Sequence, residues 1–290
     1  MFVRQAVVIV QIFIVALTSC RTSTKRNFDI IIRKGTIYDG LGGIPYRADV
    51  AILADTIAAI GNLSRDVAKI EIDATNLAVA PGFINMLSWA DGSLLKDGRS
   101  MSDLKQGVTL EIFGEGWSPG PRKKKNEKDS LWSSLGEYFT YLQKKGVSPN
   151  VASFVGATSV RNYVLGFENR KPTLEELDQM KSLVRQAMEE GALGLGSSLI
   201  YAPADYATTE ELIELCKVVA EYNGMYITHM RSESDKILTA LNEVFTIAKE
   251  ANVPAEIYHL KINNEWNWNK IDTVIYKIDS AQKSGLKISA

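Results

Sequence analysis

The chain has 290 residues, of which 46% are hydrophobic and 23% are charged, and its formal net charge is −1. A chain of this length and composition folds into a globular protein with a large buried core. The charge balance provides neither the basic surplus typical of nucleic-acid binding nor an acidic tail, so we exclude nucleic acid as a partner.

The first twenty residues are typical of a targeting signal rather than of the fold. Arg4 precedes an apolar stretch at residues 6–17, which is too short to span a bilayer comfortably. The stretch ends in Leu17-Thr18-Ser19-Cys20, which resembles the bacterial lipobox. This resemblance implies cleavage before Cys20, acylation of Cys20 and a tether over residues 21–28, hence a membrane-anchored lipoprotein of the bacterial envelope, facing the periplasm or the surface. An ordinary secretory signal with a chance cysteine is the alternative.

The second cysteine, Cys216, lies in a helical stripe with Leu212, Leu215 and Val219. Such a stripe predicts a small core residue. With Cys20 acylated, the chain has no pair of thiols left for a disulfide.

Residues 29–76 form a β-rich segment. Four short strands are predicted at residues 29–32, 48–53, 56–60 and 70–72, with turn residues such as Gly40 and Gly42-Gly43 between them. These strands are too few for a full barrel, so the segment is predicted to be a small, incomplete β module.

From residue 77 onwards, strands and helices alternate. Strands are predicted at residues 77–80 with 83–84, 108–113, 151–155, 192–197, 225–229, 255–259 and 286–290. Two helices between them open with capping boxes, Thr173 with Glu176 and Thr208 with Glu211. Further apolar stripes of helical spacing cover residues 131–142, 237–248 and 271–278.

This alternation predicts an α/β fold, a (β/α)₈ TIM-like barrel over residues 77–290 of which about seven strands are present. The chain ends inside the seventh strand, so we expect a barrel truncated before strand eight. An open sheet of seven strands is the alternative.

The chain contains only two histidines, His229 and His259, and each closes a strand-like run. They are thirty positions apart, about one βα repeat, which places them on neighbouring parallel strands at the same end. Two imidazoles at a barrel mouth suggest a metal site. Two hydrogen-bonded histidines at strand ends are the alternative.

Several motifs occur together in a recognisable order. They are Pro81-Gly82-Phe83-Ile84-Asn85, Gln106-Gly107-Val108-Thr109, Gly191-Ala192-Leu193-Gly194-Leu195-Gly196-Ser197, Tyr201-Ala202-Pro203-Ala204, Tyr226-Ile227-Thr228-His229-Met230-Arg231 and His259-Leu260-Lys261. From about Asp29 to its end, the chain resembles the amidohydrolase superfamily, and within it the D-aminoacylase branch, the N-acyl-D-amino-acid deacylases.

The resemblance implies a metal-dependent barrel whose N-terminal β module is completed by C-terminal strands. It implies hydrolysis of the amide, a non-peptide C–N bond, of N-acyl amino acids or related small peptide derivatives. The family's catalytic Asp follows strand eight, beyond residue 290, so we expect the 290-residue chain alone to be inactive. A non-catalytic, metal-poor barrel lipoprotein that binds a ligand or partner at the envelope is the alternative.

The chain departs from the family pattern at three positions. Leu87-Ser88-Trp89 replaces the family's His-x-His pair, and Ala157 replaces a common His. Gly116 aligns with a ligating Cys, and Glu115 stands one residue before it. The interpretation is one divalent metal ion, Zn²⁺, held by His229, His259 and Glu115 with a position open to water. An exposed loop charge is the alternative for Glu115.

Three further residues in these motifs are candidates for binding the substrate. Lys261 could pair with a substrate carboxylate, and Tyr201 could donate to an acyl carbonyl. Arg231 is the third candidate. The alternatives are a solvated lysine, a packing tyrosine and an arginine that holds a loop by a salt bridge.

Overall fold

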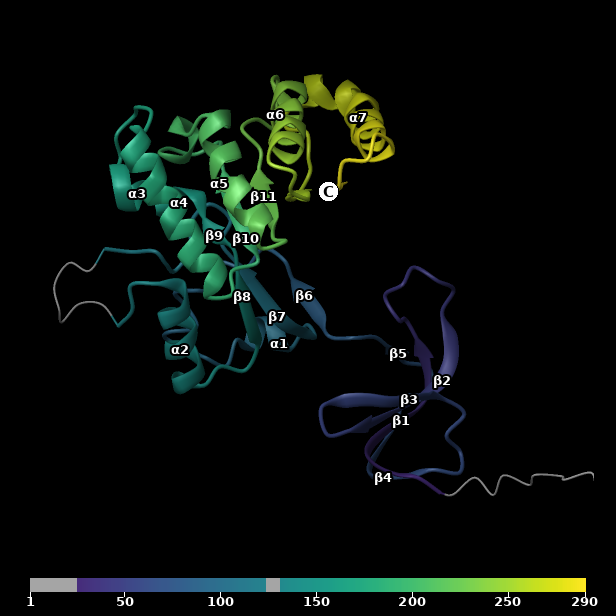
Figure 1. The fold of residues 1–290 in the computed structure, drawn as a ribbon. Helices are drawn as coiled ribbons and strands as arrows, with labels where there is room; N and C mark the ends of the chain where they lie inside the picture. Colours follow the sequence, from purple (N-terminus) through teal and green to yellow (C-terminus); the bar gives the residue numbers. More distant parts are fainter. Residues whose placement is uncertain (1–24, 124–130) are drawn as a thin grey trace, which may run out of the picture. The chain divides into compact units, whose positions relative to one another are not determined.

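The computed structural model describes residues 25–123 and 131–290, which form two compact units divided between Pro81 and Gly82 (Figure 1). The predicted signal peptide, Cys20 and the start of the tether lie outside the described residues. Within the described ranges, no helix is both long enough and apolar enough to cross a membrane.

The first unit is a five-stranded sheet. Its strands are β1 (Asn27–Ile37), β2 (Tyr46–Leu53), β3 (Thr56–Gly61), β4 (Val67–Asp73) and β5 (Ala78–Val79). The order is β3-β2-β1-β4, and β5 also pairs with β1. β1 and β2 are antiparallel, whereas β4 and β5 both run parallel to β1. A small core of Phe28, Ile31, Ala51 and Leu63 holds the sheet together.

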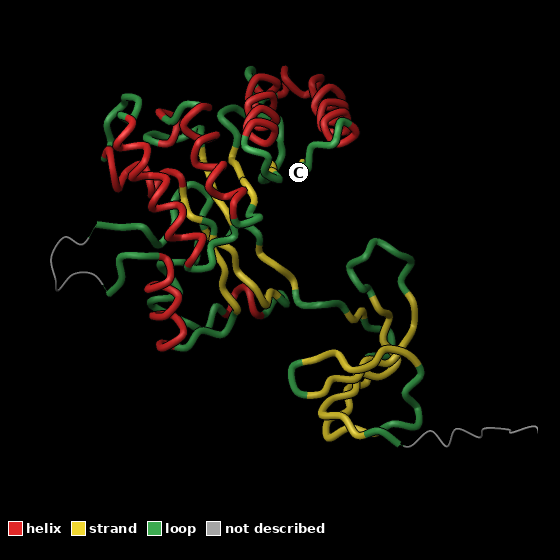
Figure 2. Tube along the Cα trace, viewed as in Figure 1, coloured by secondary structure: helices red, strands yellow, loops and turns green. Residues whose placement is uncertain are grey.

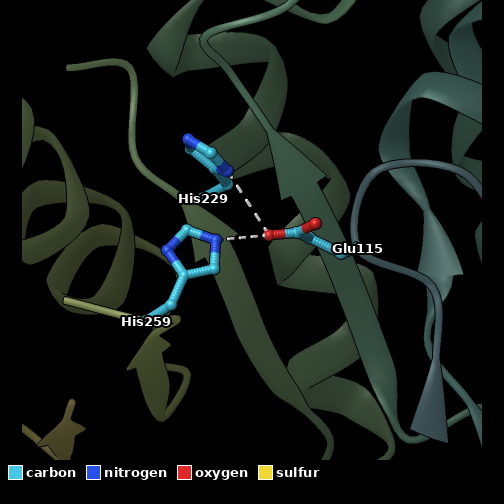
Figure 3. Close-up of side chains that lie close together, drawn as sticks. All are labelled: Glu115, His229 and His259. Carbon is cyan, nitrogen blue, oxygen red and sulfur yellow. Dashed lines mark hydrogen bonds and ion pairs between the residues drawn. The ribbon is translucent and has the colours of Figure 1, made fainter. Parts of the chain in front are cut away.

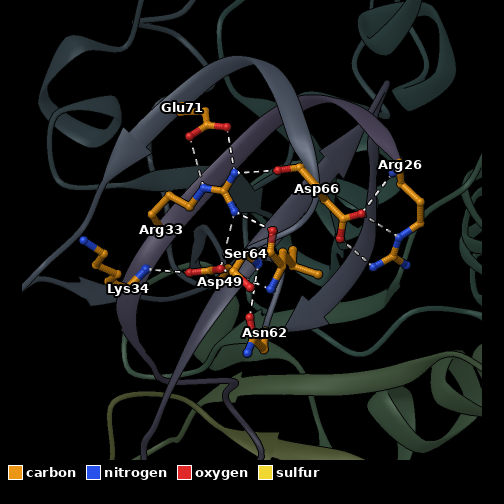
Figure 4. A network of polar contacts seen from close by, with 9 residues as sticks. Arg26, Arg33, Lys34, Asp49, Asn62, Ser64, Asp66 and Glu71 are labelled. Atoms are coloured by element: carbon orange, nitrogen blue, oxygen red, sulfur yellow. Dashed lines mark hydrogen bonds and ion pairs between the residues drawn. The ribbon is translucent and has the colours of Figure 1, made fainter. Parts of the chain in front are cut away.

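Polar contacts tie the loop between β3 and β4 to β1 (Figure 4). The Arg33 guanidinium donates to the carbonyls of Leu63 and Asp66 and forms an ion pair with Glu71. Arg26 pairs with the buried carboxylate of Asp66, and that guanidinium is the main reason why the pKa of Asp66 is lowered. These arginine contacts hold the loop between β3 and β4 against β1 in a unit that has only a small apolar core.

β5 corrects the predicted domain boundary. Residues 77–80 were expected to begin the barrel, but Thr36 and Ile37 of β1 pair with Ala78 and Val79. This segment therefore belongs to the first unit, and the second unit begins at Gly82. The sequence could not distinguish these cases because a short apolar strand before Pro81 suits either sheet.

The eight short strands that the structure describes in the second unit fill seven successive places in a parallel arrangement, because β8 and β9 share one place. They are β6 (Phe83–Asn85), β7 (Val108–Phe113), β8 (Asn150–Ser153) continued by β9 (Val155–Gly156), β10 (Gly194–Ser198), β11 (Met225–His229), β12 (Ala255–Ile257) and β13 (Ile288–Ser289). The pairings are β6-β7-β8 and β9-β10-β11-β12-β13. The N–H of Phe154 donates to Phe113, and that of Leu193 donates to Ser153, so the two groups adjoin.

The helices and short helical turns connect these strands (Figure 2). They are α1 (Met101–Leu104), α2 (Leu135–Lys145), α3 (Ala157–Leu165), α4 (Leu174–Glu189), η1 (Ala204–Tyr206), α5 (Thr209–Glu221), α6 (Ile237–Glu250), η2 (Glu265–Lys270) and α7 (Ile271–Lys283). Side chains from α3 to α7 and from β9 to β13 share one apolar cluster, which includes the fully buried Cys216. The predicted α/β barrel class and the core position of Cys216 are both confirmed.

Two helix starts show how tertiary contacts modify local signals. At Thr173 both halves of the predicted capping box form with Glu176. At Thr208 the hydroxyl accepts from the Glu211 N–H, but the Glu211 carboxylate forms a buried ion pair with Arg161 at 2.5 Å. The second predicted box is therefore only half present, because a buried guanidinium requires an anionic partner more than the helix end requires a reciprocal cap.

Candidate metal centre

Three side chains meet where β7, β11 and β12 end. Glu115 follows β7, His229 is the last residue of β11, and His259 comes two residues after β12. His259 was expected inside its strand, but β12 ends at Ile257, and His259 has a φ of +39°. This turn of the backbone brings its ring beside that of His229, with centroids 4.4 Å apart in an edge-on arrangement.

The three side chains point toward one another (Figure 3). Glu115 Oε1 lies 2.8 Å from His259 Nε2 and 3.5 Å from His229 Nδ1. One ligand atom from each residue falls within 4.8 Å of the other two. The side chains of Glu115 and His229 are 5% and 8% exposed, and that of His259 is 26% exposed. Glu115 is therefore not the exposed loop charge of the alternative interpretation.

Two glycines explain why a glutamate occupies this place. Gly114 and Gly116 have φ values of +103° and +81°, which only glycine adopts easily. A Cβ at Gly116 would lie 2.7 Å from the Cβ of Ser198, and one at Gly114 would lie 2.3 Å from the Phe154 carbonyl oxygen. A cysteine could not stand at position 116 without displacing Ser198, so the carboxylate reaches inward from position 115.

This donor set fits a divalent metal ion such as Zn²⁺. Two imidazole nitrogens and one carboxylate oxygen are common zinc donors, and donors at about 2.0–2.1 Å in a tetrahedron stand about 3.3 Å from one another. The 3.5 Å distance from Glu115 to His229 is close to that value, and the 2.8 Å distance to His259 needs only a small opening. His229 Nε2 is buried and makes no hydrogen bond, and Glu233 Oε1 lies 3.5 Å from it.

The side of the mouth that follows β6 offers no such donors at positions 87 and 89. Leu87 packs against a cluster that contains Ile112, Phe154 and Ile227. Trp89 is 56% exposed, and Ser88 between them donates to the buried carboxylate of Glu111. These two side chains therefore provide no metal donor at the positions where the family resemblance implies a His-x-His pair. Ala157, the third departure, is a buried residue at the start of α3.

A buried glutamate that the sequence analysis missed stands behind the two histidines. Glu233 Oε1 lies 3.1 Å from His259 Nδ1, 3.5 Å from His229 Nε2 and 2.5 Å from Lys261 Nζ. Its side chain is 5% exposed. A signal did exist, since Glu233 is an acidic residue four positions after a strand-end histidine, but only the fold shows that it also reaches His259.

The three predicted substrate-binding residues differ in their surroundings. Lys261 donates to Glu233 and to His259 Nδ1, so it stands beside the three-residue cluster. Tyr201 is 59% exposed, and its ring lies edge-on to His229 with centroids 5.2 Å apart. Arg231 instead forms an ion pair with Glu243 of α6 and donates to the carbonyls of Asp205 and Ala207. These contacts favour the loop-holding alternative for Arg231.

A cleft of about 540 Å³ is lined in part by residues that closely follow Glu115 in the sequence. Its lining includes Trp117, Asp91, Arg122 and Tyr163. Burial raises the pKa of Asp91. A cleft of this size, lined by aromatic and a few polar groups, suits a small molecule.

The fold and these donors define a parallel α/β barrel protein with a candidate metal centre at the carboxyl ends of its strands. The chain is 34% identical to a D-aminoacylase of Alcaligenes xylosoxydans xylosoxydans over 270 residues, 89% of this chain and 56% of the relative. Its fold is similar to that of a D-aminoacylase structure described as having a binuclear metal centre with one-metal activation, at a TM-score of 0.83 and 32% identity, over 90% of this chain and 57% of that one.

An N-acyl-D-glutamate deacylase from Bordetella bronchiseptica, solved with zinc and a phosphonate inhibitor, matches at a TM-score of 0.83 and 28% identity, over 91% of this chain and 58% of that one. No family model matches the sequence. The chain belongs to the D-aminoacylase branch of the amidohydrolase superfamily. It spans about half the length of the curated relatives it matches.

Proposed function

We propose that this chain carries the metal centre of a hydrolase that cleaves the amide, a non-peptide C–N bond, of N-acyl amino acids or related small peptide derivatives. The observation that carries the proposal is the convergence of Glu115, His229 and His259 at the ends of three barrel strands. The names of the relatives, D-aminoacylase and N-acyl-D-glutamate deacylase, support the reaction class.

The proposed centre holds one Zn²⁺. His229 would ligate through Nδ1 and His259 through Nε2, because these are the nitrogens that face Glu115 Oε1. Three protein ligands leave a fourth position for water or substrate, the usual arrangement of a catalytic zinc site. When bound, the ion supplies Lewis-acid chemistry, by polarising the amide carbonyl and making a water molecule more acidic. The apolar packing of Leu87 and the exposure of Trp89 support one ion rather than two.

The substrate would be oriented by the residues around this centre. Lys261 carries an ammonium beside His259 and is the proposed partner of the substrate carboxylate, in exchange for part of its contact with Glu233. The exposed Tyr201, whose ring flanks His229, is the proposed donor to the acyl carbonyl.

We also propose that Cys20 is the acylated first residue of the mature protein and anchors it to the cell envelope. The support is the sequence Leu17-Thr18-Ser19-Cys20 after an apolar stretch. Mass spectrometry of the membrane fraction should find a lipid-modified N-terminus at Cys20. An unmodified mature chain that starts elsewhere and stays in the soluble fraction would reject this proposal.

The function is tested with native protein isolated from its own cells. Elemental analysis after dialysis should find about one zinc-like ion per chain. The loaded protein should release free amino acids from a panel of N-acetyl D- and L-amino acids, and removal of the metal by a chelator should stop that release. Metal without hydrolysis of any panel member would reject the hydrolase. Absence of metal would favour a non-catalytic barrel that binds a ligand or partner.

A further inference from the structure

Glu233 joins the two loops that carry the paired histidines. Its own loop follows β11 and His229, whereas its partners Lys261 and Asn263 lie in the loop that follows β12 and His259. Asn263 donates its side-chain amide to Glu233 Oε2 and its backbone N–H to the Glu233 carbonyl oxygen. The Glu233 carboxylate is thus buried and anchored at both oxygens, as a group with a fixed orientation must be.

Each imidazole presents one nitrogen to Glu115 and the other to Glu233. For His229 these are Nδ1 and Nε2, each 3.5 Å from its carboxylate. For His259 they are Nε2 at 2.8 Å and Nδ1 at 3.1 Å. A metal ion could in principle use either pair of nitrogens, but the Lys261 ammonium lies 2.5 Å from Glu233 Oε1 and repels a cation there. The ion therefore belongs on the Glu115 side.

The position of the proton on His259 decides which nitrogen is free to bind metal. The Lys261 ammonium lies 3.0 Å from His259 Nδ1 and can only donate, so a hydrogen bond there requires the tautomer in which Nε2 carries the proton and donates to Glu115. An Nε2 that ligates a metal cannot keep its proton, so the neutral ring must carry its proton on Nδ1 instead. One proton leaves Nε2, one arrives at Nδ1, and the ring stays neutral. Glu233 Oε1 lies 3.1 Å from Nδ1 and is placed to accept that proton.

We propose, on the basis of the proposed metal function, that Glu233 is a positioning residue that accepts the Nδ1–H of His259 and so selects the tautomer that binds metal. Carboxylates that accept the remote N–H of a metal-bound histidine fix its tautomer and orientation, and their loss typically lowers metal affinity by about 10–100-fold. Lys261 is the competing donor, because its ammonium favours the tautomer with Nδ1 unprotonated.

The two histidines make the tautomer directly observable. With ¹⁵N-histidine labelling and any affinity tag removed, the spectrum holds signals from His229 and His259 alone. On titration with ZnCl₂, we expect the N–H of His259 to move from Nε2 to Nδ1. Zinc-loaded wild-type protein in which His259 keeps its proton on Nε2 would overturn the proposal without any variant.

Variants test the role of the carboxylate itself. Glu233→Gln and Glu233→Ala should each weaken zinc binding about 10–100-fold in a competition with a chromophoric chelator. The control is Glu243→Gln, which removes a mostly buried carboxylate that pairs with Arg231 of the same loop. The control should retain wild-type zinc affinity even if it lowers the melting temperature. Equal zinc affinity in wild type and both Glu233 variants would reject the role of Glu233, whereas no zinc binding by the wild type would reject the proposed function.

Discussion

The two sides of the barrel mouth carry different kinds of side chains at the ends of their strands. After β7, β11 and β12, the side chains of Glu115, His229 and His259 converge to within 4.8 Å. After β6, Leu87 packs in an apolar cluster and Trp89 turns to solvent. The difference teaches that candidate metal donors gather at the ends of β7, β11 and β12, whereas positions 87 and 89 after β6 carry apolar side chains that cannot ligate a metal.

The largest expected effect lies on the side that has the donors. His229→Ala and His259→Ala should each abolish tight zinc binding. A site with three protein ligands that loses one ligand loses both a metal–ligand bond and the tetrahedral arrangement of the remaining donors. The double variant should bind no more weakly than either single one, since residues that act as a unit are non-additive. Calorimetric titration with ZnCl₂ measures this. Wild-type affinity in both single variants would end the metal hypothesis.

The converse experiment restores donors on the other side. The double substitution Leu87→His and Trp89→His should raise the zinc content from about one to about two ions per chain, if the packing of Leu87 is what replaced the second site. Elemental analysis after dialysis measures the ratio. The variant Leu87→Ala with Trp89→Ala is the control for loss of packing and should stay near one ion. An unchanged ratio in the histidine variant would show that the mouth differs in more than these two positions.

A smaller effect is expected at the glycine beside Glu115. Gly116→Ala places a Cβ 2.7 Å from that of Ser198 at a φ of +81°. Gly191→Ala is the matched control, because its φ is +99° and nothing lies within 4 Å of the added carbon. The strained backbone alone costs about 1–2 kcal/mol, so Gly191→Ala should lower the unfolding free energy by about that amount and Gly116→Ala by clearly more. Urea unfolding compares the two, and equal losses would mean that position 116 has room for a side chain.

The smallest effect concerns Asp91, on the side without the metal donors. Burial raises the pKa of this carboxyl above its usual 3.8, so the folded state binds its proton more tightly than the unfolded state does. Its stabilising contribution is fully present below pH 3.8 and is lost as the pH rises through the raised folded pKa. Asp91→Asn should therefore gain stability relative to wild type between pH 4 and pH 7. Urea midpoints that run parallel across this range would contradict the assignment.

The sequence predicts most of the barrel and the two histidines, but not the contacts between loops. β7 and β11 have the predicted bounds because their apolar runs are compact and are followed by turn or polar residues. The neighbouring positions of His229 and His259 follow from the spacing of one βα repeat. Glu233 was missed because its contacts with Lys261 and Asn263 join loops that only the fold brings together. Glu211 was misassigned as a reciprocal cap for the same reason, since its partner Arg161 is distant in sequence.

X-ray absorption at the zinc edge, on protein loaded with one equivalent of zinc, tests the proposed ligand set most directly. The expected spectrum contains two imidazole groups and an oxygen shell at about 2.0–2.1 Å, without sulfur, because the third proposed ligand is the carboxylate of Glu115. The oxygen contribution should fall in Glu115→Ala, whereas the two imidazole contributions should remain. A sulfur shell at about 2.3 Å, or a single imidazole, would contradict a centre made of Glu115, His229 and His259.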